Sequence, residues 1–267
     1  MSKFAGEFEE LGIISRVVCL HTSLRSFAVK VSPSEIIDSI AELDNTLMVP
    51  TMSWSVYSAP KPAWELPDEL NAELDGSIPD SAPETGFDIE SNKIGAAMGT
   101  LPRTLLENYP RVRGNHPLAS FSAIGKLANF LVGSQTPRDP LSPLSNMISG
   151  DSVVVLMGTD LTAATLLHLA ETRAGLPGLN RWAKLSTGEI IKCNVTGCSK
   201  GFERLREPLK DLETSVEKSG SIWRIYPGAE MLELATNYFL SKPLGGLCDD
   251  AKCMKCDAKR KYIGTTS

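Results

Sequence analysis

The sequence has no long apolar run and no excess of positive charge, and each absence narrows the class of protein. No stretch of its 267 residues approaches the roughly 20 apolar residues of a membrane-spanning helix, and residues 1–12 carry no basic segment before an apolar core. We therefore expect a soluble, cytoplasmic protein without membrane contact. A net charge of -5 and a pI near 5.4 argue against a nucleic-acid surface and suit a cationic ligand better.

Histidine is also scarce, and cysteine is present without a secretory signal. The chain has three histidines, His21, His116 and His168, and histidine is the usual general base because its unperturbed pKa is about 6.5. Six cysteines without a secretory signal are more typical of free thiols or metal ligands than of a disulfide framework. Glycine-rich nucleotide fingerprints are absent, since neither GxGxxG nor GxxxxGKS/T occurs.

The apolar pattern predicts one α/β domain that spans residues 1–267. With 42% hydrophobic residues, the chain can bury a full core. Residues 13–20 and 46–49 are typical of buried strands, and between them Ser32, Pro33 and Glu35 have the capping-box spacing of a helix start. A strand, a helix and a strand in this order predict parallel pairing.

The remaining segments are assigned by period and composition. Residues 53–92 have no sustained apolar period, which predicts a long surface loop or small subdomain. The strongest buried-strand signal is at residues 153–157, and a hairpin is expected from residues 182–186 and 189–195. Helical spacing of apolar residues predicts helices at residues 121–131, 161–173, 202–218 and 230–240.

His168 and Glu171 are the best candidates for acid–base chemistry. On a helix, residues 165, 168 and 171 share one face, because they are spaced by three. A carboxylate beside an imidazole orients its tautomer and stabilises its protonated form, which suits a general base that deprotonates an attacking amine. The alternative is a structural histidine with a surface glutamate, because such pairs are common on helices.

Two further segments carry polar groups that suit a pocket. His116 lies in the turn-like residues 113–117, where it either faces a pocket or serves as a hydrogen-bonded loop histidine. The HTSLRS sequence at residues 21–26 follows the first predicted strand. Its hydroxyls, backbone amides and guanidinium could hold phosphates or a pantetheine chain.

Residues 197–201, GCSKG, match the GxSxG pattern of the serine nucleophile in α/β-hydrolases. In that fold the catalytic histidine follows the serine, whereas every histidine of this chain precedes Ser199. The motif also follows a predicted hairpin and not a central strand. A serine hydrolase is therefore the rival hypothesis, and the chain order argues against it.

The cysteines near the C-terminus have a spacing that suits a metal. Cys248, Cys253 and Cys256 give C-x4-C-x2-C, and Cys193 with Cys198 gives a second gap of four residues. A structural zinc site that uses Cys198 with the three C-terminal cysteines is one interpretation. Small buried thiols are the other interpretation.

Six segments, in this order along most of the chain, resemble the aminoglycoside 3-N-acetyltransferase family. They are HTSLRSF at residues 21–27, TLMVPTMSW at 46–54, NHPLASFSAIGKLA at 115–128, LSPL at 141–144, VVLMGTDLTAATLLHLAE at 154–171 and GCSKGF at 197–202. The Cys-containing tail, residues 241–267, resembles the ending of one branch of these proteins.

The resemblance implies a three-layer α/β fold, in which helices flank a mixed central sheet and a long acidic loop is inserted. It implies direct transfer of an acetyl group from acetyl-CoA to the 3-amino group of a 2-deoxystreptamine aminoglycoside. His168 would be the general base, Glu171 its partner and His116 a residue of the same site. Backbone amides near residues 116–120 would stabilise the oxyanion.

The same resemblance implies ligand contacts along the chain. The residues expected to bind coenzyme A are His21, Thr22, Ser23, Leu24, Arg25, Ser26, Ser120, Leu141, Ser142 and Pro143. The residues expected to bind the acceptor are Trp54, Tyr57, Asp88 and Glu171, together with the loop between residues 65 and 90.

The acceptor itself is left open by the sequence. The loop is rich in carboxylates, which either attract a polycationic aminoglycoside or form a solvated surface: Glu65, Asp68, Glu69, Glu73, Asp75, Asp80, Glu84, Asp88 and Glu90. Gly114 and Asn115 stand where the family commonly has arginine and serine. The alternatives are an N-acetyltransferase for another small amine and, from a different class, a zinc-stabilised binding module without activity.

Overall fold

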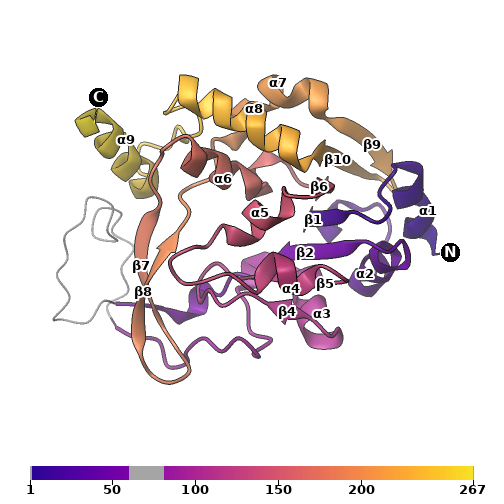
Figure 1. The fold of residues 1–267 in the computed structure, drawn as a ribbon, viewed down its shortest axis with the longest axis horizontal. Helices are drawn as coiled ribbons and strands as arrows, with labels where there is room; N and C mark the ends of the chain where they lie inside the picture. Colours follow the sequence, from indigo (N-terminus) through magenta and orange to yellow (C-terminus); the bar gives the residue numbers. More distant parts are fainter. Residues whose placement is uncertain (1, 60–80, 267) are drawn as a thin grey trace.

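The computed structural model describes residues 2–59 and 81–266 (Figure 1). The acidic residues predicted to steer the acceptor lie partly outside this range, namely Glu65, Asp68, Glu69, Glu73, Asp75 and Asp80. The described start of the predicted loop has structure of its own, with a 3-10 turn at Trp54–Val56 and the short strand β3 at Tyr57–Ser58.

A seven-stranded mixed sheet forms the centre of the molecule, in the order β4-β5-β2-β1-β6-β10-β9. Its strands are β1 (Val17–Thr22), β2 (Thr46–Pro50), β4 (Val112–Arg113), β5 (Phe121–Ile124), β6 (Ser152–Met157), β9 (Thr214–Lys218) and β10 (Ser221–Pro227). Strand β1 pairs in parallel with β2 and β6, whereas β5 and β10 extend the sheet with antiparallel pairs. The predicted parallel unit is confirmed, with helix α2 (Pro33–Glu42) between β1 and β2.

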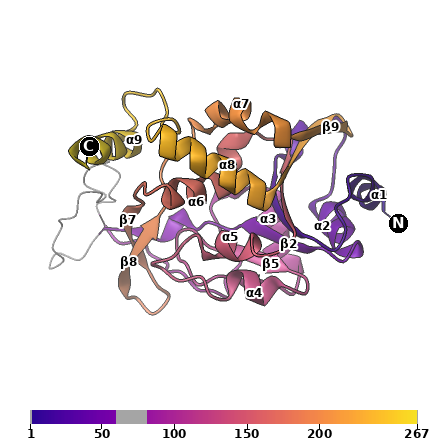
Figure 2. The same cartoon turned by 45° about the horizontal axis from the view of Figure 1, so that its top comes forward.

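Helices cover both faces of this sheet because successive residues in its strands point to opposite sides. In β1, Val17 and Cys19 join the apolar layer under helices α4, α5, α6 and α8, while Val18 and Leu20 join the layer under α1, α2 and α3. The helices not yet defined are α1 (Lys3–Glu10), α3 (Thr100–Asn108), α4 (Ala128–Val132), α5 (Ser142–Met147), α6 (Leu166–Arg173), α7 (Arg206–Leu209), α8 (Gly228–Ser241) and α9 (Met254–Thr266). The expected α/β class with helices on a mixed sheet is confirmed. Figure 2 shows α6 and α8 side by side on one face.

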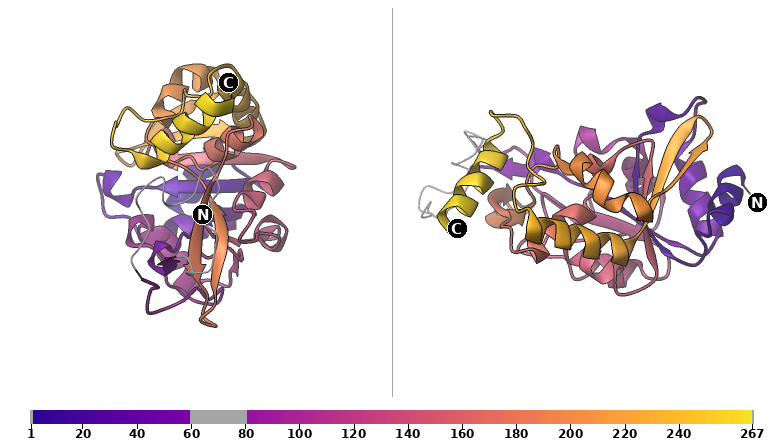
Figure 3. Two further views of the ribbon diagram at one scale, coloured as in Figure 1. Left: turned by 90° about the vertical axis from the view of Figure 1, so that its left-hand side faces the viewer. Right: turned by 90° about the horizontal axis from the view of Figure 1, so that it is seen from above.

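A second sheet has the order β3-β7-β8, and its strands β7 (Leu179–Lys184) and β8 (Ile190–Val195) form the predicted hairpin. The C-terminal helix α9 packs on this sheet, because Ala258 and Tyr262 share an apolar cluster with Leu179 and Val195. The two ends of the chain lie at opposite ends of the molecule (Figure 3). Within residues 2–59 and 81–266, the structure contains no helix with the length and apolar character of a bilayer span.

The helix predicted at residues 121–131 is wrong in its first half. Residues Phe121–Ile124 form β5, which is fully buried between β2 and β4, and only Ala128–Val132 is helical. Apolar residues at both strand and helix spacing made the pattern ambiguous. Gly125 separates the two elements with a φ of 108°, a conformation that other residues rarely adopt.

Three other predictions needed correction. The helix expected at residues 161–173 begins as a 3-10 turn, and α6 starts only at Leu166. In residues 202–218, short helical turns end at Leu212, and β9 follows as an exposed edge strand paired with β10. Ser32 occupies the N-cap of α2 without a side-chain cap hydrogen bond, so the predicted capping box is absent while the proline start is present.

Candidate active site

A large cavity lies at the carboxyl ends of the parallel strands. It has a volume of about 960 Å³, and its lining includes residues that follow β1, β2 and β6, such as Ser23, Trp54 and Thr159. Ligands of open α/β sheets bind at this edge, because the loops that leave parallel strands converge there. The position of the cavity is therefore set by the same strands that the apolar pattern predicts.

The lining of this first cavity contains three cationic side chains. Arg25, Lys30 and Lys255 all contribute to it, as does the first turn of α3. The hydroxyl of Thr22 is buried and has no hydrogen-bond partner among the described residues. Guanidinium and ammonium groups with hydroxyls and a helix N-terminus are the donors that phosphates prefer.

His168 forms a buried pair with Glu171 beside this cavity. Its Nδ1 lies 2.7 Å from Oε2 of Glu171, so the imidazole donates through Nδ1 and keeps Nε2 as its basic nitrogen. The edge of the Phe202 ring packs on the imidazole at a centroid distance of 4.7 Å. The hydrogen bond and the ring contact together fix the orientation of the imidazole.

Lys259 completes this group from the C-terminal helix. Its Nζ lies 2.8 Å from Oε1 of Glu171, and only 2% of the Lys259 side chain and 4% of the Glu171 side chain are exposed. Burial alone raises the pKa of Glu171, but the hydrogen bond from His168 and the charge of Lys259 outweigh it and hold the pKa below its ordinary value. Glu171 is therefore an ionised carboxylate with a different partner on each oxygen.

A second cavity, of about 270 Å³, lies on the other side of His168. Its lining includes Glu171, Lys259, Arg138 and Asp139. His168, Thr196 and Gly197 line both cavities, so the imidazole stands between them.

The structure gives His116 a different place from the one expected. Its ring is fully buried and lines neither cavity; Nε2 donates to the carbonyl of Asn194 at 2.7 Å. The backbone amides of Leu118 and Ala119 donate to Nδ1, so these amides are already used and do not serve as the expected oxyanion donors. Burial lowers the pKa of His116 to about 4 against the opposing hydrogen bond to Asn194, so the ring stays neutral at neutral pH.

The residues expected to bind coenzyme A are only partly brought together. His21, Thr22, Ser23, Leu24 and Arg25 all line the first cavity, and burial lowers the pKa of His21 to about 4. The hydroxyl of Ser26 instead bonds to Ser221 and to the carbonyl of Ser23.

The other segments expected at coenzyme A lie elsewhere. Ser120 is fully buried and donates to the carbonyl of Thr51, away from both cavities. Leu141 lines the second cavity, while Ser142 and Pro143 line neither. Residues 21–25 and Leu141 thus line different cavities beside His168.

The expected acceptor residues also separate. Trp54 lines the first cavity, where the Lys255 ammonium lies 5.3 Å from its ring centroid. Tyr57 meets the edge of Trp54 but belongs to β3 and lines neither cavity. Asp88 is exposed and accepts a hydrogen bond from the backbone of Glu90, so the structure does not bring it to the site.

Sequence reasoning missed the lysines of α9. Lys255 and Lys259 are four residues apart in a segment that shows no apolar period, and nothing in the sequence signals that it folds back onto residues 168–171. The GCSKG segment does lie at the site, but without the chemistry of a hydrolase. Ser199 lines the first cavity and has no hydrogen bond to a histidine among the described residues, so the hydrolase hypothesis gains no support.

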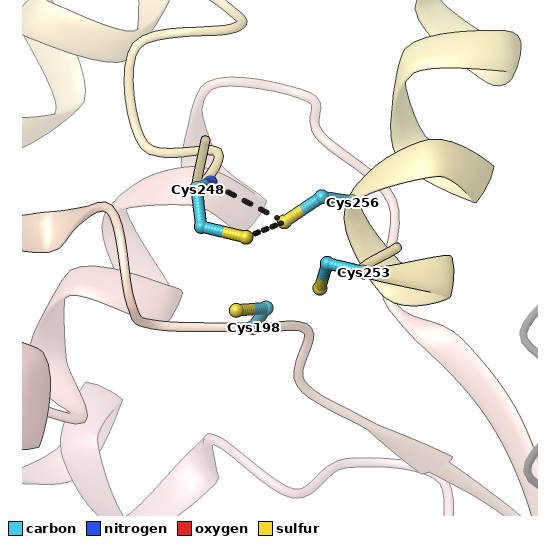
Figure 4. A group of neighbouring side chains, drawn as sticks. All are labelled: Cys198, Cys248, Cys253 and Cys256. Carbon is cyan, nitrogen blue, oxygen red and sulfur yellow. Dashed lines mark hydrogen bonds between the residues drawn. The ribbon is translucent and has the colours of Figure 1, made fainter. Parts of the chain in front are cut away.

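The four cysteines predicted as metal ligands converge on one point (Figure 4). The sulfur atoms of Cys198, Cys248, Cys253 and Cys256 all lie within 4.8 Å of one another. All four are free thiols, and the Sγ atoms of Cys248 and Cys256 are 3.5 Å apart. Backbone amides of Lys200 and Cys248 point at the sulfurs of Cys198 and Cys256. Four sulfurs at such distances suit a tetrahedral ion, whose Zn–S bonds of about 2.3 Å require sulfur separations near 3.8 Å.

These features define an α/β protein with an oriented imidazole beside a cation-lined cavity at the ends of parallel strands. Comparison with known proteins identifies the family to which this chain belongs. The family model for aminoglycoside 3-N-acetyltransferase matches residues 19–229, and the chain belongs to this family. The resemblance seen in the sequence is confirmed.

The curated relatives match over part of their length. Aminoglycoside N(3)-acetyltransferase VIII of Streptomyces fradiae is 30% identical over 187 residues, which cover 64% of this chain and 60% of that protein. Aminoglycoside N(3)-acetyltransferase VII of Streptomyces paromomycinus is 41% identical over 83 residues, or 30% of this chain and 29% of that protein. The chain therefore aligns with less than two thirds of each of these relatives.

Solved structures share the fold along nearly the whole chain. The apoenzyme of aminoglycoside acetyltransferase AAC(3)-IVa matches with a TM-score of 0.75 and 23% identity, over 97% of this chain and 95% of that one. AAC-IIIb in a binary complex with CoASH matches with a TM-score of 0.69 and 17% identity, over 89% of this chain and 95% of that one. The family-specific fold expected from the sequence is confirmed.

Proposed function

We propose that this chain transfers the acetyl group of acetyl-CoA to the 3-amino group of a 2-deoxystreptamine aminoglycoside, with His168 as the general base. The observation that carries the proposal is the His168 Nδ1 to Glu171 Oε2 contact of 2.7 Å, buried between two cavities. Family membership supports the reaction class, and relatives named as aminoglycoside N(3)-acetyltransferases support the acceptor class.

The chemistry proceeds by direct attack. The amine nitrogen forms a bond to the thioester carbonyl carbon while its proton passes to Nε2 of His168. The tetrahedral intermediate then collapses, the C–S bond breaks, and the sulfur leaves with a proton as the free thiol of coenzyme A. Glu171 accepts the Nδ1 hydrogen bond throughout, which stabilises the imidazolium that forms between the two proton transfers.

We place coenzyme A in the first cavity. Its volume of about 960 Å³ is at the upper end of the range of about 300–1,000 Å³ usual for ligand sites. Arg25 and Lys30 would hold the phosphates, and the hydroxyl of Thr22 supplies a further polar contact. A neighbour of the same fold bound to CoASH is consistent with this assignment.

The acceptor amine must reach Nε2 of His168, and Trp54 in the same lining is our candidate for contact with the acceptor. A histidine-to-alanine mutant of the fold neighbour AAC(3)-IVa has a structure in complex with apramycin. For this chain the proposal specifies His168 as the base, and an assay with a panel of amines identifies the acceptor.

We also propose a structural Zn²⁺ on Cys198, Cys248, Cys253 and Cys256. Their sulfur separations and the amide donors to two of the sulfurs fit a closed four-thiolate site. Such a site leaves no open position for substrate, so this metal would take no part in acetyl transfer.

The test is release of free thiol from acetyl-CoA by the purified protein with gentamicin, kanamycin, apramycin and simple non-antibiotic amines. We expect turnover with at least one aminoglycoside and mass-spectrometric evidence for acetylation of its 3-amino group. Turnover with other amines alone would replace the acceptor and keep the reaction. No turnover with any amine, in a protein that also fails to bind coenzyme A, would favour the non-catalytic binding module.

A further inference from the structure

The C-terminal tail is docked onto the segment that contains the GCSKG match. A side chain at Gly197 would place its Cβ 2.8 Å from Cε of Lys259, and one at Gly201 would place it 2.4 Å from the carbonyl oxygen of Gly246. Both distances are too short for a Cβ, so the absence of a side chain at these two positions allows the tail to approach closely. Cys198, between them, contributes to the thiol cluster.

Two arginines stabilise the same tail, one from the preceding segment and one from within the tail. Arg204, in the turn after Gly201, donates to the carbonyl of Leu247 and pairs with Asp249. Arg260, on α9, donates to the carbonyl of Cys248 at 2.6 Å. The thiol cluster belongs to the same tail, because Cys253 directly precedes α9, Cys256 lies in its first turn and Cys248 lies in the loop before it (Figure 4).

Helix α9 then presents one lysine to each cavity beside His168. Lys255 lines the first cavity and Lys259 lines the second, and residues four apart share a helix face. Lys259 is the closer link to the chemistry, because it holds Oε1 of Glu171 while His168 holds Oε2. The position of Glu171 therefore depends on a helix whose start is set by the four cysteines.

We infer that the metal-held tail is a positioning element of the active site: Zn²⁺ on the four cysteines seats α9, and Lys259 on that helix holds Glu171 so that His168 is oriented for proton transfer. The inference rests on the proposed function. It assigns Lys259 as a positioning residue, since it contacts the partner of the base and not the reacting atoms.

The physical reason is that a buried carboxylate needs a partner on each oxygen. Without the ammonium of Lys259, Oε1 of Glu171 would face a nearly closed environment unpaired, and the carboxylate would rotate towards another donor. Rotation would weaken the Nδ1 hydrogen bond that fixes the tautomer of His168. Groups that orient metal-binding histidines usually contribute about 10- to 100-fold, and we expect an effect of the same order for Lys259.

The experiment compares Lys259→Met, Lys259→Arg and Cys253→Ser with two matched controls. Lys261→Met removes the same charge from an exposed site on the same helix, where the lysine pairs with Asp257. Cys193→Ala removes a buried cysteine outside the thiol cluster. Zinc content, hydrogen exchange of residues 247–266, kcat and KM for acetyl-CoA are measured on each full-length protein.

We expect one zinc per chain in the wild type, the lysine variants and both controls, and loss of zinc in Cys253→Ser. Lys259→Met should lower kcat by about 10- to 100-fold with KM for acetyl-CoA nearly unchanged. The acidic limb of its pH–rate profile should move to higher pH, because loss of a nearby positive charge favours the protonated imidazole. Lys259→Arg should recover part of kcat. Cys253→Ser should show faster exchange in α9 and a similar loss of kcat.

Other charged or titratable groups around His168 are unchanged in the lysine variants. They are Arg138, Asp139 and Glu171 in the second cavity, and His21, Arg25, Lys30 and Lys255 in the first. A shift of the acidic limb of the pH–rate profile would therefore come from the loss of Lys259. The Lys261→Met control should keep both kcat and the pH profile of the wild type.

The inference would be overturned by a Lys259→Met protein that keeps zinc, kcat and the wild-type pH profile. It would also be overturned if Cys253→Ser lost zinc without faster exchange in α9. Should Lys259→Met fail to fold, zinc is removed from the folded wild type by a chelator, and faster exchange in α9 with a lower kcat is expected. An unchanged kcat after zinc removal would overturn the inference. A wild type that acetylates no amine would refute the proposed function alone. The inference could then still be tested, because ¹⁵N spectra of the three histidines report the His168–Glu171 hydrogen bond without turnover.

Discussion

The two sides of His168 are built from different parts of the chain. On one side, the first cavity is formed mainly by loops that leave β1, β2 and β6, three neighbouring parallel strands of the central sheet. On the other side, Glu171 is held by Lys259 from a helix near the end of the chain, 88 residues away in sequence. The strand-end side follows from sheet topology, whereas the tail side follows from contacts specific to this tail.

The difference separates binding from orientation. Groups on the strand-end side, such as Arg25 and Thr22, line the first cavity, where we propose that acetyl-CoA binds. Lys259 on the tail side instead contacts Glu171, and through it acts on the imidazole. Substitutions on the first side should therefore change KM for acetyl-CoA, and substitutions on the second should change kcat.

The largest effect is expected where the two sides meet. His168→Ala removes the proton acceptor, so kcat should fall by about 10²- to 10⁴-fold while coenzyme A affinity stays near the wild-type value. Thiol release measures the rate, and calorimetric titration with coenzyme A measures the affinity. An active His168→Ala protein would refute the base, and loss of coenzyme A binding would show that the two sides are not separable.

Glu171→Gln should have the next largest effect, on both kcat and stability. The amide keeps the shape of the side chain but leaves the buried ammonium of Lys259 without a counter-charge. Breaking a buried ion pair from one partner costs about 3–5 kcal/mol in free energy of unfolding. Urea unfolding at neutral pH measures the stability, and kcat should fall by about 10- to 100-fold in parallel.

The pH dependence of this stability difference gives an internal control. The pKa of Glu171 is lower in the folded protein than its ordinary value of 4.5, so its stabilisation is complete above 4.5 and is lost as the pH falls through the folded value. The gap between wild type and Glu171→Gln should therefore be constant near neutral pH and shrink in acid. A gap that widened in acid would contradict an ionised Glu171.

The strand-end side is also the side that could be predicted. A β-branched strand, a proline-started helix and a second strand predicted the β1–α2–β2 unit, and residues 153–157 predicted β6, whose six residues are all buried. The spacing of His168 and Glu171 predicted their contact, because both lie within one helix. Local periodicity carries this information, since it depends on neighbours in sequence.

The tail side could not be predicted in the same way. The cysteine spacing suggested a metal site, but nothing in residues 257–261, DAKRK, indicates that Lys259 is buried while Lys261 is exposed. That difference depends on how α9 packs, and the tail that carries α9 contacts Gly197 and Gly201 and contributes three cysteines to the thiol cluster. His116 was misplaced for a related reason, because a loop sequence does not tell which backbone groups its ring will meet.

A third prediction concerns the titration of His116. Burial lowers the pKa of His116 from 6.5 to about 4, so between these values the unfolded chain binds more protons and stability falls as pH falls. His116→Gln should flatten this slope by up to about 1.4 kcal/mol per pH unit. Urea unfolding across this range measures the slope, part of which remains because burial also lowers the pKa of His21 to about 4.

The kinetic outcome of the same variant bears on the comparison. Because His116 lines neither cavity, His116→Gln should keep kcat per folded molecule within about twofold of the wild type, as expected for a residue whose loss affects stability alone. A fall in kcat comparable to that of His168→Ala would restore His116 to the site predicted from the sequence.

The smallest effect is expected on the strand-end side. Arg25 is exposed at the first cavity, so Arg25→Ala should raise KM for acetyl-CoA by about tenfold, or about 1.4 kcal/mol, and leave kcat unchanged. The rise of KM with ionic strength should also be weaker in the variant, because salt screens the attraction between exposed charges and phosphates. Lys126→Ala removes the same charge at a site that pairs with Asp44 and lines neither cavity, so it is the matched control. If both variants gave the same shift in KM, the effect would come from net charge, and coenzyme A would have to be held by other groups of the cavity. If Arg25→Ala lowered kcat instead, the loop after β1 would also help to orient His168, a role that we otherwise assign to the tail.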